Sequence, residues 1–306
     1  MFDVILQMAG LILCGIVWRV LQPAGLEPIA TRKVLTSLVY YLLLPALVIS
    51  VLWETELGTA SLVIAGAAAF GVITGLLLSL GSCYFCKNRS AETGAIIIAV
   101  AFPNVTYMGL PVLEATFGPW ARSIAIQYDL FAATPLLFTL GIFIAMRFGS
   151  GVETKERVLQ GLLRIPVLWA ALLAIGLNLS GLPKIESIAG LLTLLERGVV
   201  PLMLFSLGLS LEWSSGMRRL FPNLIPIVIL RMLVVPALVL ILLNGLDVTG
   251  DLRTAIVMEA AMPCMVIGLV ICDRFNLDTS LYAAAVTVTT ALSLITLPLW
   301  HAWVGG

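Results

Sequence analysis

Long runs of apolar residues alternate along this chain with short polar turns. A helix that crosses the hydrocarbon core of a bilayer needs about 20 consecutive, mostly apolar residues. Ten runs of roughly that length can be found. The pattern therefore predicts ten membrane-spanning helices, at 4–22, 34–53, 60–84, 92–117, 122–147, 158–180, 188–211, 222–243, 252–273 and 280–303.

The longest polar stretch, GSGVETKER at 149–157, divides the ten predicted spans into five and five. We therefore expect a first five-helix unit at 1–147, a cytoplasmic linker at 148–157 and a second five-helix unit at 158–306. Five is an odd number, so the second unit enters the bilayer from the side opposite to the first. If the units are related, they form an inverted repeat, an arrangement found in many secondary transporters.

Prolines interrupt the same two spans of each half. Pro45 and Pro103 lie in the second and fourth spans, and Pro201 and Pro263 in the seventh and ninth. Proline removes a backbone donor and clashes with the preceding turn of a helix. Each proline alone is explained by a packing kink, but the matched positions favour spans 4 and 9 as discontinuous helices that cross at the bilayer midplane.

The composition agrees with a polytopic membrane protein of the all-α class. Hydrophobic residues make up 60% of the 306 residues, charged residues only 11%, and the mean hydropathy is +1.10. Soluble domains carry about 25% charged residues, so the composition excludes a soluble enzyme. The chain has 17 basic and 17 acidic residues, which leaves no polybasic face and excludes a nucleic-acid partner.

Basic residues gather in the turns on one side of the predicted bundle. The turns after odd-numbered spans hold eleven Lys and Arg residues, and the opposite turns hold three, namely Arg122, Lys184 and Arg253. Cytoplasmic loops carry the excess of basic residues. We expect a multi-pass protein of the plasma membrane with both termini outside the cytoplasm. The first span follows no basic segment, so we expect it to be retained rather than cleaved.

Motifs for enzymes, metals and cofactors are absent from the sequence. There is no H-E-x-x-H, G-x-S-x-G or Walker motif, so we expect no catalytic residue and no cofactor. Cys83 and Cys86 form a C-x-x-C, but no second pair or nearby histidine completes a zinc site, and helix packing explains them better. The single histidine, His301, cannot form a metal cluster by itself.

Several stretches resemble the auxin efflux carrier family, which includes the plant PIN proteins and bacterial carriers. They are YYLLLPALVIS, AFPNVTYMGLPVL, LFTLG, VVPLMLFSLGLSL, AAMPCMVIGLVICDRFNLD and ALSLITLPLW. The resemblance covers essentially the whole chain. It implies ten spans in two inverted repeats, a scaffold part and a transport part, crossed broken helices 4 and 9, and small organic anions as substrates. The central loop is much shorter here than in many plant carriers.

The resemblance and the helix break together single out Asn104. It follows Pro103, where free N–H groups of a broken helix suit a carboxylate, and its amide adds a directional donor. The alternative is that Asn104 only caps the helix. By the resemblance, Pro103, Pro263 and Cys264 complete the substrate site, although Cys264 stands where the family has a second amide.

Five ionisable residues within the predicted spans are candidates for a functional role, because charge is costly there: Asp129, Glu196, Arg197, Arg231 and Glu259. Asp129 and Glu259 are candidates for binding a coupling proton. The alternative is a fixed ion pair with Arg231 or Arg197. Arg231, near the midplane, either attracts the anion or is held by one of these acids, and the second interpretation is slightly favoured.

The sequence thus predicts a secondary transporter of a small organic anion, a dicarboxylate or an auxin-like acid, that works by alternating access without enzymatic activity. The first alternative is a sodium-coupled carrier of the bile-acid symporter type. An intramembrane enzyme and a channel are more remote alternatives. The expected partners are the substrate, the lipid bilayer and, by family analogy, a second copy of the chain.

Overall fold

A computed structural model describes residues 2–86, 88–150, 165–211 and 217–305. This part of the chain is helical and contains no strand, as the sequence predicts. The first half comprises α1 (Phe2–Leu21), η1 (Pro23–Gly25), α2 (Pro28–Leu38), η2 (Val39–Leu43), α3 (Leu44–Leu52), α4 (Thr59–Cys86), α5 (Ser90–Ala101), η3 (Val105–Gly109), α6 (Leu110–Phe117), η4 (Pro119–Ala121), α7 (Arg122–Tyr128), η5 (Asp129–Ala133), α8 (Thr134–Leu136), η6 (Leu137–Gly141) and α9 (Ile142–Phe148). The second half comprises α11 (Pro166–Leu179), α12 (Glu186–Glu196), α13 (Val199–Ser210), α14 (Met217–Ile229), η7 (Leu230–Val234), α15 (Val235–Gly245), α16 (Gly250–Ala260), α17 (Gly268–Arg274) and α18 (Thr279–Gly305).

Six helical stretches of the described chain are long and apolar enough to cross a membrane: Pro28–Leu52, Thr59–Cys86, Pro119–Phe148, Glu186–Ser210, Leu220–Gly245 and Thr279–Gly305. They match six of the ten predicted spans. The predicted first span is the shorter apolar helix Leu6–Leu21, and the sixth is Pro166–Leu179. The spans predicted at 92–117 and 252–273 are each divided between separate helices. Most of the predicted linker 148–157 and the start of the sixth span lie outside the described residues.

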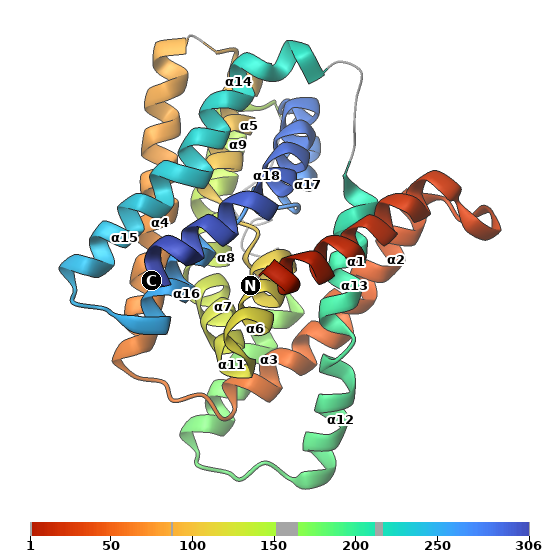
Figure 1. The fold of residues 1–306 in the computed structure, drawn as a ribbon, viewed down its shortest axis with the longest axis vertical. Coiled ribbons are helices and arrows are strands. Elements are labelled where there is room, and N and C mark those ends of the chain that lie inside the picture. Colours follow the sequence, from red (N-terminus) through yellow and green to blue (C-terminus); the bar gives the residue numbers. More distant parts are fainter. Residues whose placement is uncertain (1, 87, 151–164, 212–216, 306) are drawn as a thin grey trace.

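The helices pack as two groups, each drawn from both halves of the sequence (Figure 1). One group consists of α1, α2, α3, α11, α12 and α13. The other is built around α4, α5, α9, α14, α15, α16 and α18. Helices α6 and α7 lie where the two groups meet, since they contact α1 and α3 as well as α4 and α16.

Four π-helical turns precede prolines within the membrane-spanning stretches. The turns η2, η3, η5 and η7 each end two residues before a proline, namely Pro45, Pro111, Pro135 and Pro236. Proline cannot donate to the preceding turn, and its ring needs space there. A π turn provides that space by adding one residue to the helix, without ending it.

Helix α1 crosses α13 in backbone-to-backbone contact. A Cβ atom added at Gly15 would meet the carbonyl oxygen of Phe205 and lie 2.9 Å from the Cα of Gly208. Gly75 of α4 is in a similar backbone contact, since a Cβ atom there would lie 2.9 Å from the Cα of Ala101. Small residues let helices approach this closely in membranes.

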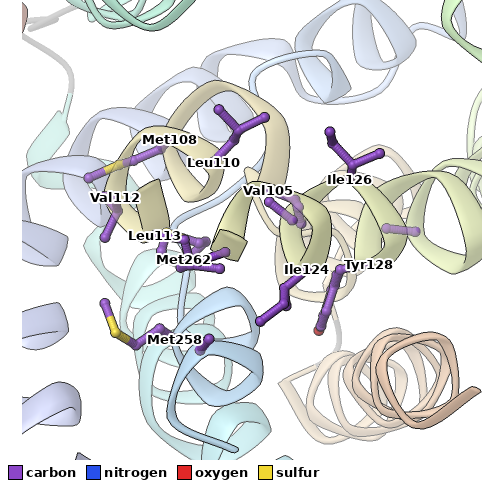
Figure 2. Close-up of a cluster of buried hydrophobic side chains, with 14 of the residues drawn as sticks. Val105, Met108, Leu110, Val112, Leu113, Ile124, Ile126, Tyr128, Met258 and Met262 are labelled. Carbon is purple, nitrogen blue, oxygen red and sulfur yellow. The ribbon is translucent and has the colours of Figure 1, made fainter. Parts of the chain in front are cut away.

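The apolar core is densest around η3, α6, α7 and α16. Figure 2 shows buried hydrophobic side chains of these elements and of the segment after α16, and the labelled ones are Val105, Met108, Leu110, Val112, Leu113, Ile124, Ile126, Tyr128, Met258 and Met262. All of these side chains are buried. This core fixes the position of the chain segment that follows Pro103.

Candidate functional site

Two non-helical segments meet in the interior of the protein. Residues 102–104 separate α5 from η3, and residues 261–267 separate α16 from α17. The segments form an antiparallel backbone bridge between Pro103 and Cys264. The Asn104 N–H donates to the Pro263 carbonyl at 2.8 Å, and the Met265 N–H donates to the Phe102 carbonyl at 3.1 Å. These bonds satisfy backbone groups that the interrupted helices leave free.

Arg231 holds the helix ends on one side of this backbone bridge. Its guanidinium donates to the carbonyl oxygens of Val100, at 2.9 Å, and Ala101, at 3.3 Å, and also to that of Ala260. These carbonyls belong to the last turns of α5 and α16, where the helix dipoles are negative. The side chain is 1% exposed. A buried guanidinium is therefore stabilised by two helix ends at once.

The acidic partner that the sequence predicts for Arg231 is not seen in the described structure. No described carboxylate forms an ion pair with Arg231, although the side chain is indeed held in place. Carbonyl oxygens at two helix ends supply the compensating negative charge. Arg197 is exposed, at the junction of α12 and α13, and makes no ion pair with Asp129 or Glu259 in the described structure. Asp129 and Glu259 therefore make no ion pair with either arginine in the described structure.

Asn104 lies at the start of η3 with a buried amide. It is 1% exposed, and its backbone carbonyl accepts bonds from the N–H groups of Met108 and Gly109. Its side chain makes no capping bond to the helix, and its Nδ2 has no hydrogen-bond partner within the described chain. A buried donor left unbonded costs free energy. A ligand that accepts a bond from Nδ2 would remove that cost.

A central cavity of about 530 Å³ opens beside Asn104. Ligand pockets for small molecules range from about 300 to 1,000 Å³. The walls are mostly apolar, with hydroxyl groups and one acid among them. The lining residues are Thr36, Ser37, Tyr40, Tyr41, Leu44, Asn104, Thr106, Tyr107, Asp129, Leu130, Thr134, Leu137, Phe138, Ile165, Val167, Met265, Ile267 and Val270.

Asp129 is the acid in the wall of the central cavity. Its two carboxylate oxygens accept hydrogen bonds from the hydroxyl groups of Thr106 and Thr134, the second at 2.8 Å. Thr106 is two residues beyond Asn104 on η3. Asp129 is therefore linked by a hydrogen bond to the same turn that presents the Asn104 amide.

Glu259 is buried elsewhere, on the last turn of α16. It is 0% exposed, and neither carboxyl oxygen has a hydrogen-bond partner in the described chain. A Cβ atom added at Gly109 would meet its carboxyl group. Gly109 is thus the residue of η3 that leaves room for Glu259. The glutamate does not line the central cavity.

A second, polar cavity of about 750 Å³ lies toward the opposite ends of the helices. Arg122 lines it and donates to Glu196 at 3.0 Å and to Glu114. Lys184 lines it as well, with its Nζ 3.2 Å from a carboxylate oxygen of Glu54. Arg122 and Glu114 lie on α7 and α6, and Glu196 ends α12, so these ion pairs link α12 to the helices that lie where the two groups meet.

The two cavities are separated by a tightly packed apolar layer. A void of about 10 Å³ lies in this layer beside Leu44, Val48, Leu110 and Ile126. A void of this volume is at the lower limit for holding a single water molecule. The central cavity and the polar cavity have no lining residue in common in the described chain.

The structure brings some of the predicted site residues together and not others. Asn104 and Asp129 share the central cavity, whereas Pro103, Pro263 and Cys264 form the backbone bridge behind it. Cys264 is fully buried, and its N–H donates to the Thr289 hydroxyl at 3.1 Å. Sequence reasoning missed Thr106 and Tyr107, although both lie in the same NVTY segment as Asn104.

Comparisons with known proteins place the whole chain among membrane transporters. A family model described as membrane transport protein matches residues 4–301. An uncharacterized transporter of Methanothermobacter thermautotrophicus is 30% identical over 304 residues, 97% of this chain and 96% of the relative. One of Methanocaldococcus jannaschii is 26% identical over 310 residues, 97% of each chain. The uncharacterized transporter YfdV of Escherichia coli K12 is 22% identical over 253 residues, 81% of this chain and 77% of YfdV.

Proposed function

The chain belongs to the auxin efflux carrier family of membrane transport proteins, and we propose that it is a secondary transporter that moves a small organic anion by alternating access. One observation carries the proposal. The buried, unbonded Nδ2 of Asn104 lines a cavity of about 530 Å³ beside two interrupted helices that meet. We take these helices to be the crossed broken helices of an inverted ten-helix repeat.

An anion suits the donors that surround the backbone bridge. The first N–H groups of η3 have no acceptor within their own helix, and they carry the positive end of its dipole. The Asn104 amide adds a directional donor beside them. Arg231 neutralises the negative ends of α5 and α16, so those ends do not repel an anion at the bridge.

Asp129 is the coupling group in this proposal. An ionised carboxylate in the wall of the cavity repels an anionic substrate, and the repulsion is strong where water is scarce. A proton on Asp129 removes the repulsion. Proton and anion therefore bind together, which makes transport of the anion dependent on the proton gradient. The hydroxyl groups of Thr106 and Thr134 hold the carboxyl group in place.

The central cavity is open toward the cytoplasm in our proposed orientation. Its lining includes Thr36, Ile165 and Val270, which lie near the turns richest in basic residues. The polar cavity lies near the opposite turns, beside Lys184 and Arg122. Movement of the two helix groups against each other would open the polar cavity to the bridge and close the central one. Labelling of cysteines introduced at Ser150 and Gly306 with an impermeant thiol reagent tests the orientation: position 306 is modified in sealed cells and position 150 is spared.

Sodium coupling is the alternative mechanism, and Glu259 favours it. A fully buried carboxyl group without a hydrogen-bond partner in the described chain is a plausible ligand for a cation. Uptake into proteoliposomes with sodium replaced by choline separates the mechanisms. Transport that persists without sodium and follows an imposed proton gradient supports the proton mechanism.

The test of the site is the variant Asn104→Ala. The purified protein is first screened by thermal shift against dicarboxylates and aromatic carboxylates, because a ligand of the native state raises its stability. A hydrogen bond to a charged group contributes about 1.5–3 kcal/mol, so we expect Asn104→Ala to weaken binding by roughly ten- to a hundredfold. Asn244→Ala, which changes an exposed amide far along the chain, is the control. Equal affinities in both variants and the parent would remove Asn104 from the site.

A further inference from the structure

A small side cavity of about 130 Å³ adjoins the central cavity. The two cavities share four wall residues, Thr36, Tyr107, Ile267 and Val270. A water molecule occupies about 30 Å³ of liquid, so the side cavity has room for a group as large as a carboxylate. Nothing in the proposed function so far uses this space.

The side cavity differs from the central cavity in its charge. Arg32, on α2, lines it, and no acidic residue is among the lining residues that the structure describes. Ser206, on α13, lines it as well, is 2% exposed, and has no hydrogen-bond partner for its hydroxyl group in the described chain. An arginine and an unbonded hydroxyl donor on one small cavity are the groups that recognise a carboxylate.

We propose that the side cavity is a second anion subsite, in which Arg32 and Ser206 bind the distal carboxylate of a dicarboxylate. The other carboxylate of the same molecule lies at Asn104 in the central cavity. This inference rests on the proposed function, because it needs an organic anion at Asn104. It makes Arg32 the residue that distinguishes a dicarboxylate from a monocarboxylate.

The two subsites lie on different helix groups. Arg32 and Ser206 belong to the group of α1, α2 and α13, and Asn104 belongs to the interrupted span that packs with α4 and α16. A dicarboxylate bound to both subsites therefore bridges the groups. A monocarboxylate bound at Asn104 has no second carboxylate for Arg32 and Ser206, and therefore does not link the two helix groups.

The test compares dicarboxylates with analogues that lack only the second charge. Malonate, succinate, glutarate and adipate are each titrated into the purified protein alongside their monoamides, so that the series also finds the chain length that spans the subsites. Removing one charged hydrogen-bonding group costs roughly ten- to a hundredfold in affinity. We expect the parent protein to prefer the best dicarboxylate over its monoamide by that factor.

Arg32→Gln should bring the ratio of the affinity for the dicarboxylate to that for its monoamide close to one. The affinity for the monoamide itself should stay unchanged. Ser206→Ala should reduce the preference by a smaller factor, since a neutral donor contributes less than a charged one. Lys33→Gln, at the exposed neighbouring position, is the control for loss of a positive charge and should keep the parent preference. Arg32→Lys keeps the charge and should keep part of the preference.

The outcomes separate the subsite from the proposed function. If Arg32→Gln keeps the parent preference, or weakens the dicarboxylate and the monoamide equally, the second subsite is wrong while anion binding at Asn104 stands. If no carboxylate of either kind binds the parent protein, the proposed function and the subsite both fail. Thermal melting of each variant without ligand shows whether it is folded, and Arg32→Lys replaces Arg32→Gln in the comparison if the latter is not.

Discussion

The guanidinium of Arg231 lies 2.9 Å from the carbonyl oxygen of Val100 and donates a hydrogen bond to it. Its other bonds reach Ala101 and Ala260, so one side chain ties together the ends of α5 and α16. Both helix ends would otherwise present buried carbonyls that the surrounding apolar core cannot satisfy. Arg231 is thus a structural support for the backbone bridge and not a partner of an acid.

We expect Arg231→Met to destabilise the protein strongly. Each buried carbonyl left without a donor costs about 1–3 kcal/mol, and three are affected. Thermal unfolding in detergent measures the effect. Arg197→Met is the control, since Arg197 is exposed, and should change stability by no more than about 0.5 kcal/mol. Adding Glu259→Gln to Arg231→Met should not restore stability, and restoration would show that the two side chains form a pair.

A leucine at Gly15 should disrupt the crossing of α1 and α13. The added side chain would collide with the backbone at Phe205 and Gly208, which cannot move without shifting α13. Overpacking of this kind costs about 1–3 kcal/mol. Gly10→Leu is the matched control, because a Cβ atom at Gly10 meets nothing within 4 Å. Equal melting temperatures for the two variants would contradict the close contact.

The ion pair between Arg122 and Glu196 should hold the polar cavity closed to the central one. It joins α7 to α12, so movement of α12 relative to α7 has to break it. We expect Glu196→Gln to speed the labelling of a cysteine introduced at Gln127, a buried residue that lines the polar cavity. Glu56→Gln removes an exposed acid from the same cavity and should leave the labelling rate unchanged. A rate that Glu196→Gln does not alter would mean that this ion pair does not resist the movement.

Much of the fold follows from the sequence, because backbone N–H and C=O groups inside a bilayer must be hydrogen-bonded within the protein. Long apolar runs that cross the bilayer therefore form helices. The apolar runs predict the helices, and the family resemblance is confirmed by the match over residues 4–301. The prolines at 103 and 263 coincide with the two non-helical segments, since a residue without an N–H cannot supply one of the helical hydrogen bonds. The π turns before other prolines were not predicted. A proline in an apolar span is compatible with a kinked helix, a π turn or a break, and the sequence does not distinguish the three.

The partners of buried charges could not be predicted in the same way. Every residue has a carbonyl, so no sequence feature marks Val100 or Ala260 as the acceptors for Arg231. Glu196 lies beside Arg197 in the chain, yet it forms its ion pair with Arg122, which lies on a different helix. Thr106 and Tyr107 belong to an apolar span, and only the three-dimensional position of η3 brings them to the central cavity.

Asp129→Asn should make transport insensitive to pH. In the proposed mechanism the protonated form of Asp129 accompanies the anion, so uptake by the parent protein rises as the pH on the substrate side falls. Asparagine resembles the neutral acid in size and polarity and carries no titrating proton, so binding of the anion should persist while the pH profile becomes flat. One of the Thr106 and Thr134 hydroxyls can still donate to the amide oxygen, and the amide NH2 can donate to the oxygen of the other hydroxyl, which keeps both contacts. Glu186→Gln, at an exposed position at the start of α12, is the control and should keep the parent profile. Uptake assays in proteoliposomes across a pH series, with binding measured in parallel, provide the readout. A pH profile that Asp129→Asn leaves unchanged would exclude Asp129 as the coupling group and would direct attention to Glu259.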